Sequence, residues 1–203
     1  MGAKKFFSST WFRCISVLLI IAVVAGGLLA ALNDVLYVSP AERSGRAIKK
    51  IYGKKLAYEV VLDIDETDDS KNDAIVYDEL GSINKVYNVS VNGKTDMLIQ
   101  ATGFGGYKGT VTVWVRVTTD GSKYDIATVI LESYTKETLM SKLTDEFYNK
   151  FCLKDVTALY NAGENFTPYP NEGGIQNVVS GATKSSNAGC NAVNSVIKYL
   201  GEL

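Results

Sequence analysis

The strongest pattern in the chain is an apolar run near its start. Residues 14–32 carry no charged side chain, and about 20 such residues are needed for a helix to span a bilayer. We therefore expect a transmembrane helix over 14–32. The alternative is a cleavable signal peptide, whose apolar core is usually shorter. The small residues Ala25-Gly26-Gly27, which would suit cleavage, lie inside the run rather than after it.

The charges on either side of this run predict its orientation. Lys4, Lys5 and Arg13 precede it, whereas the first basic residue after it is Arg43. The positive-inside rule therefore predicts a single-pass protein of the cell membrane, with a cytoplasmic N-terminus and an extracytoplasmic main domain. The expected division is a cytoplasmic N-terminus (1–13), a transmembrane helix (14–32), a juxtamembrane helical spacer (33–56) and one extracytoplasmic domain (57–203).

A short helix is expected directly after the span. Ser39-Pro40-Ala41-Glu42 has the form of a capping box with Pro at the first helical position. The helix should run to about Tyr52 and end at Gly53. We interpret it as a spacer between bilayer and domain.

The middle of the chain alternates with the period of a β-strand. Residues 58–62 predict one strand, and residues 83–91 and 94–101 predict a hairpin around Asn92-Gly93. Residues 110–118 and 124–131 flank Asp120-Gly121 in the same way. Two hairpins make a twisted antiparallel sheet.

Two further segments have the period of a helix. From Thr138 onward, large apolar residues recur every four positions, at Leu139, Leu143, Phe147 and Phe151. After Thr183, small or apolar residues mark one helix face, at Ala188, Ala192, Val193, Val196, Ile197 and Leu200. The polar residues 161–174, rich in Gly and Pro, predict a loop. The fold class is therefore α+β, with helices packed on the sheet.

Composition excludes several kinds of function. The net charge of −1 offers no electrostatic basis for binding nucleic acid, and the absence of histidine removes the usual general base and zinc ligand. Three cysteines are too few and too scattered to hold an iron–sulfur cluster. Cys152 and Cys190 are either a disulfide or two unpaired core residues. The acidic segment 63–73 lacks the Gly and Glu of a calcium loop, so we expect a solvated loop and no metal site.

Three short segments carry candidate chemistry. Ser180-Gly181-Ala182-Thr183 precedes the last helix, where it is either an ordinary cap or a phosphate site at a helix N-terminus. The glycine-rich run 103–109 is either a bulge or a backbone that approaches a flat ligand, with Phe104 or Tyr107 beside it. Glu137 and Thr138 either cap a helix or face that ligand.

These segments occur in the order found in FMN-binding domains. The glycine-rich run, two strands, Lys136-Glu137-Thr138 and Ser180-Gly181-Ala182-Thr183 follow one another along the chain. On these motifs the chain resembles the G subunit of the Rnf ion-pumping ferredoxin:NAD oxidoreductase. It is also similar to the related C subunit of the sodium-pumping NADH:quinone reductase. The resemblance covers residues 83–200 in detail and the N-terminal anchor in kind.

The resemblance implies that FMN is joined covalently, through its phosphate, to Thr183 by a flavin transferase. The chain departs from the family at two places: the family usually has Asp at position 177, and it tends to have Pro-Gly-Leu-Gly in place of residues 139–142. Residues implied to bind the cofactor are Thr183, Ser180, Gly181, Ala182, Ser185, Ser186, Asn177, Gly105, Gly106, Tyr107, Phe104, Glu137, Thr138 and Leu139.

The implied function is electron transfer within a membrane-bound, ion-translocating oxidoreductase. This chain would relay electrons between partner subunits that hold other flavins and iron–sulfur centres, and no residue of its own would be catalytic. Two alternatives remain open. One is an anchored structural or sensing subunit without flavin, and the other is a stand-alone extracytoplasmic flavoprotein reductase.

Overall fold

The computed structural model describes residues 10–36, 40–64 and 73–203, which form two compact units divided between Arg43 and Ser44. The first unit contains helix α2 (Thr10–Leu36). Its segment Cys14–Leu32 has a mean hydropathy of 2.8 and no buried part, so its length and composition allow it to cross a membrane. The predicted cap at Ser39 and the acidic residues 65–72 lie outside the described residues.

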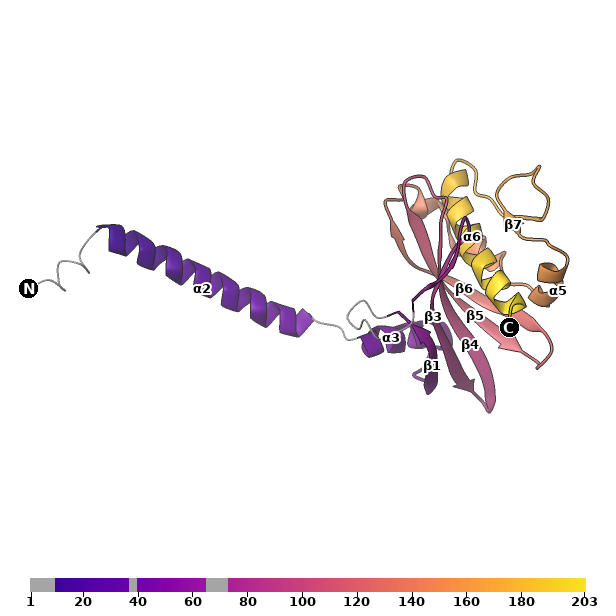
Figure 1. Cartoon of the computed structure of the whole chain (residues 1–203), viewed down its shortest axis with the longest axis horizontal. Helices are drawn as coiled ribbons and strands as arrows, with labels where there is room; N and C mark the ends of the chain where they lie inside the picture. Colours follow the sequence, from indigo (N-terminus) through magenta and orange to yellow (C-terminus); the bar gives the residue numbers. More distant parts are fainter. Residues whose placement is uncertain (1–9, 37–39, 65–72) are drawn as a thin grey trace, which may run out of the picture. The chain divides into compact units, whose positions relative to one another are not determined.

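The second unit is built on a six-stranded sheet whose neighbouring strands are all antiparallel. The order is β1-β3-β4-β5-β6, and β2 also pairs with β3 (Figure 1). This confirms the predicted mixture of helices and antiparallel sheet. The strands are β1 (Tyr58–Asp63), β2 (Ile75–Tyr77), β3 (Gly81–Val91), β4 (Lys94–Gly103), β5 (Thr110–Thr119) and β6 (Tyr124–Thr135).

Both predicted hairpins form, with different turns. Val91 pairs with Lys94 across Asn92 and Gly93, whose φ values of 51° and 81° are those of a two-residue turn. The second hairpin has a longer connection, because Thr119 pairs with Tyr124. Within it, backbone N–H groups of Ser122 and Lys123 donate to the Asp120 carboxylate.

One face of the sheet carries the main core. Helix α6 (Thr183–Gly201) crosses this face over β3, β4 and β5 (Figure 1), and α4 (Asp145–Asn149) and α5 (Val156–Asn161) pack beside β6. Apolar residues recur at the helical period in α6 and at every second position in the strands. Each set therefore lies on one face of its element, and the two faces pack together. Fully buried members of this core include Ile83, Val86, Ile99, Val113, Val115, Phe151, Val193 and Val196.

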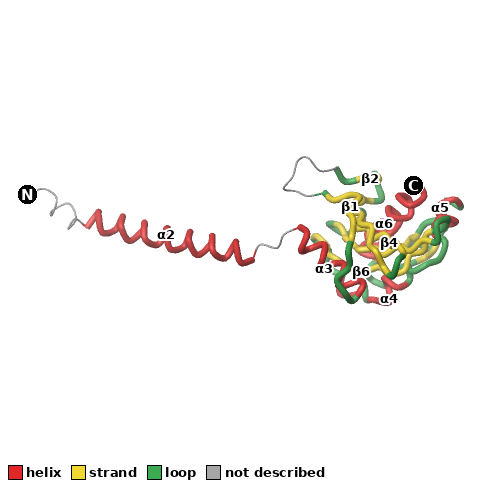
Figure 2. The backbone as a smooth tube through the Cα atoms, turned by 90° about the horizontal axis from the view of Figure 1, so that it is seen from below, coloured by secondary structure: helices red, strands yellow, loops and turns green. Residues whose placement is uncertain are grey.

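Helix α3 (Pro40–Tyr52) covers the opposite face from Ser44 onward. Ala47 and Ile48 are buried in a second core with Tyr87, Val89, Leu98 and Trp114. In Figure 2, α3 and α5 lie on opposite sides of the strands. The segment that we interpreted as a spacer therefore belongs, from Ser44 on, to the folded unit.

The single helix predicted from Thr138 is wrong. The chain instead forms a 3₁₀ turn, η1 (Met140–Lys142), followed by α4, and the break lies at Leu143 and Thr144, with ψ values of 83° and 176°. The four-residue spacing had a different cause: Leu143, Phe147 and Phe151 are all buried in the main core. Elements that we did not predict are β2, α5 and the parallel pair β7 (Phe166–Thr167) and β8 (Ile175–Gln176).

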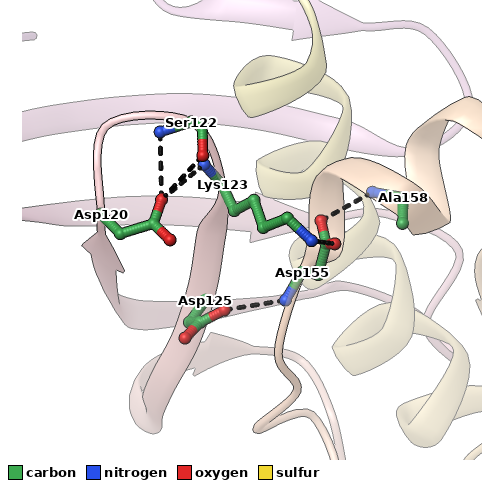
Figure 3. A network of polar contacts seen from close by, with 6 residues as sticks. All are labelled: Asp120, Ser122, Lys123, Asp125, Asp155 and Ala158. Carbon is green, nitrogen blue, oxygen red and sulfur yellow. Dashed lines mark hydrogen bonds and ion pairs between the residues drawn. The ribbon is translucent and has the colours of Figure 1, made fainter.

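A polar network joins the β5–β6 turn to the start of α5 (Figure 3). Lys123 forms an ion pair with Asp155, whose carboxylate also accepts from the backbone N–H of Ala158 and so caps α5. The backbone N–H of Asp155 in turn donates to Asp125 at 2.8 Å. Asp155 has a left-handed backbone, with φ of 55°, and these contacts hold it there.

This network should make stability depend on pH. The hydrogen bond with Lys123 lowers the pKa of Asp155, and the same bond raises the pKa of Lys123. A lowered carboxyl pKa stabilises the fold above the unfolded value of about 3.9, and this contribution is lost as pH falls through the folded value. We expect Lys123→Met to destabilise the protein at pH 7 and to show a smaller deficit at pH 3, which lies below the unfolded carboxyl value of about 3.9. Urea unfolding at both pH values measures this, and an equal deficit at both would contradict it.

Candidate functional site

A pocket of about 610 Å³ opens at the N-terminal end of α6. This size lies within the roughly 300–1,000 Å³ of small-molecule sites. Its lining brings together three of the segments singled out in the sequence. The lining residues are Tyr107, Thr138, Leu139, Gly181, Ala182, Thr183, Lys184 and Ser185.

Thr183 is the first residue of α6, directly at this pocket. Gly181 has a φ of 73°, which allows the tight turn that precedes the helix. The N-cap residue is Ala182, and it makes no side-chain cap bond. The ordinary Ser/Thr cap that was one interpretation of this motif is therefore not formed. The helix start instead presents backbone N–H groups and the positive end of the helix dipole to the pocket.

The other serines of the motif have structural contacts. Ser186 is fully buried, and its Oγ accepts from the backbone N–H of Val179 at 3.1 Å. Ser185 donates to Glu137 at 2.5 Å. Ser180 is exposed in the turn and does not line the pocket.

Glu137 lies behind the pocket rather than in it. Its side chain is 6% exposed and accepts from Ser185 Oγ and from the backbone N–H of Lys108. A Cβ on Gly106 would stand 2.1 Å from Glu137 Oε1 and 2.6 Å from the backbone carbonyl oxygen of Gly109, so a side chain here would displace the carboxylate and crowd the main chain. Glu137 thus ties the glycine-rich run to the first turn of α6.

The glycine-rich run is held against α6 by two further bonds. Asn187 donates to the carbonyl of Gly105 at 3.1 Å, and Asn191 donates to the carbonyl of Phe104 at 3.0 Å. Of the two aromatic candidates, only Tyr107 lines the pocket, and its side chain is 61% exposed. Phe104, Gly105 and Gly106 support the site without lining it.

Asn177 lies outside the pocket, buried beneath the motif. It is 1% exposed, and its Nδ2 donates to the carbonyl of Phe147 at 3.1 Å. Its Oδ1 has no hydrogen-bond partner among the described residues. In this chain Asn177 therefore anchors the segment before the motif to α4.

Lys142 is a site residue that sequence reasoning missed. A Cβ on Gly181 would lie 3.0 Å from Lys142 Nζ, so the ammonium group stands over the turn that leads into α6. With Lys184, which lines the pocket, it adds positive charge beside a helix N-terminus. The signal in the sequence was the departure from the motif at position 142, where Lys stands in place of the Gly that the expected FMN-binding family tends to have.

The cysteines do not contribute to this site. Cys152 and Cys190 are free, which settles the alternative left open above. Burial raises the pKa of the Cys190 thiol to about 12, and also raises that of Cys152. Among the described residues, no group of three or more His, Cys, Asp or Glu side chains could hold a metal ion.

Comparison with known proteins finds no match to this chain, whether among family models, curated proteins or solved structures.

Proposed function

We propose that this chain carries FMN as a phosphoester on Thr183 and is the electron-transfer subunit of an Rnf-type ion-translocating oxidoreductase. The observation that carries the proposal is the position of Thr183. Thr183 is the first residue of a 19-residue helix and lines a pocket of about 610 Å³, and no side chain caps the N-terminus of that helix. A phosphate esterified there would meet free N–H groups and the positive end of the dipole.

The residues present fit such a cofactor. Lys142 and Lys184 would complement the phosphate charge, and Tyr107 and Leu139 offer an aromatic and an apolar surface to the ring. Bound FMN supplies the redox chemistry. The chain's own groups tether it through Thr183, partly exclude water and hold the pocket walls in place through Glu137 and Ser185.

The partners follow from this proposal. A flavin transferase would attach the cofactor, and other membrane subunits bearing flavins and iron–sulfur centres would deliver and accept electrons. Helix α2 would be the anchor. The proposed orientation, with the N-terminus cytoplasmic and the main domain outside, rests on the one basic residue that adjoins the span, Arg13. The basic residues after the span, Arg43, Arg46, Lys49 and Lys50, lie 11 to 18 positions beyond Leu32.

Intact-protein mass spectrometry of the denatured chain tests the proposal. Protein from transferase-competent cells should carry the mass of phosphoester-linked FMN, mapped to the peptide containing Thr183. Thr183→Val should lose essentially all of it, while Ser180→Ala, in the turn before the helix, should keep it. Retention of covalent flavin in Thr183→Val would show that the site is wrong. An unmodified wild-type chain would overturn the flavin itself.

A further inference from the structure

Positive charge is concentrated in and just after α3. Between Arg46 and Lys55 the chain has five basic residues and no acidic one. Residues 56–203 have the opposite balance, with 12 basic and 20 acidic residues. The basic segment is therefore a local feature of a unit that is otherwise acidic.

The fold directs these charges to solvent. Burial of Ser44, Ala47 and Ile48 against the sheet fixes which side of α3 faces inward. Four lysines are exposed on and beyond its outer side: Lys49, Lys50, Lys54 and Lys55. Lys50 donates to the carbonyl of Leu131 at 3.2 Å. Lys49, Lys54 and Lys55 have no ion-pair partner among the described residues, so their charges are uncompensated within that part of the chain.

We propose that this lysine face, defined as Lys49, Lys54 and Lys55, binds the anionic headgroups of the membrane that holds α2. The positive charge of this face favours an anionic partner. Because α3 follows the proposed membrane helix α2 in the same chain, we infer that this partner is the surface of that membrane. Only residues 37–39 separate α2 from α3 in the sequence, so the tether gives this face a high effective concentration at the membrane surface. Basic clusters beside a membrane helix are attracted to the negative surface potential of anionic lipid, and in the orientation proposed above the leaflet concerned is the outer one. The inference rests on the anchor proposed above but not on the flavin.

The experiment uses the full chain in nanodiscs, with either purely zwitterionic lipid or about a third anionic lipid. Lysines are labelled with an amine-reactive reagent and their modification is read by peptide mass spectrometry. We expect Lys49, Lys54 and Lys55 to be labelled several-fold more slowly in anionic discs. High salt should remove the protection, because it reduces the screening length to about 3 Å at 1 M. The exposed lysines Lys123 and Lys150 serve as internal controls and should not change.

A variant makes the result specific. Lys49→Gln/Lys54→Gln/Lys55→Gln keeps the Lys50 contact and should unfold like wild type. In the wild type, Lys50, which is next to Lys49 in α3, should also be labelled more slowly in anionic discs, and the variant should lose this protection. Equal labelling of the wild-type face in both kinds of disc would overturn the inference while leaving the anchor intact. Failure of the chain to enter either disc would overturn the anchor and this inference together, and the mass of the Thr183 peptide would still report separately on the flavin.

Discussion

Gly103→Ala is expected to destabilise the protein by about 3 kcal/mol or more, as overpacking against a rigid backbone does. Gly103 ends β4 directly beneath α6. A Cβ there would stand 1.9 Å from the carbonyl oxygen of Ala188 and 2.4 Å from the backbone nitrogen of Ala192. Both are main-chain atoms of a helix, so no side-chain rotation can relieve the clash. The helix would have to move away from the sheet.

The matched control is Gly45→Ala in α3, where a Cβ would meet nothing within 4 Å. Because alanine is the better helix former, this change should stabilise the protein by about 0.5–1 kcal/mol. Urea unfolding of both variants measures the two free energies. Displacement of α6 would also move Thr183, so if Thr183 carries the proposed flavin, Gly103→Ala should lower the flavin content in cells. A loss of less than about 1 kcal/mol would show that α6 does not lie this close to β4.

Asn177→Asp is expected to cost about 3 kcal/mol at pH 7, because it places an acceptor against the carbonyl of Phe147 in a desolvated position. The result bears on the proposed FMN-binding family, which usually has Asp at this position. In this fold the amide donates a hydrogen bond that a carboxylate cannot make.

The penalty should depend on pH in a defined direction. Burial raises the pKa of a carboxyl group, and in its protonated form the new carboxyl at position 177 could donate to the same carbonyl. The deficit against wild type should be smallest below about pH 4, where the carboxyl is protonated in both states. It should then grow with pH until the folded carboxyl ionises.

Asn187→Asp is the control for this change. Asn187 also donates to a carbonyl, that of Gly105, but its contact is solvent-exposed. Loss of this hydrogen bond should lower the free energy of unfolding by about 1 kcal/mol or less. That decrease should depend on pH much less than the decrease caused by Asn177→Asp. Equal effects at the two positions would contradict the burial of Asn177. An increase in stability for Asn177→Asp would contradict its hydrogen bond to Phe147.

Patterns along the chain were sufficient for the elements whose stability is local. The apolar run in α2, the alternation in β3 to β6, the Asn92-Gly93 turn and the single apolar face of α6 each follow from a period or from one residue's backbone preference. The same patterns could not distinguish a continuous helix from a segment in which every fourth residue is buried for another reason. At Leu143 and Thr144 the backbone leaves the helix, yet Leu143 and Phe147 still reach the core.

The sequence by itself determined the anchor-like helix, the antiparallel sheet and the position of Thr183 near a helix start. Only the tertiary structure decided that α3 covers the second face of the sheet, that Asn177 donates to Phe147, and that Lys142 stands over Gly181. The physical reason is the distance along the chain between partners. A hydrogen bond or pocket wall formed by residues 30 to 80 positions apart depends on how the sheet and helices pack. A periodic pattern within one segment does not predict that packing.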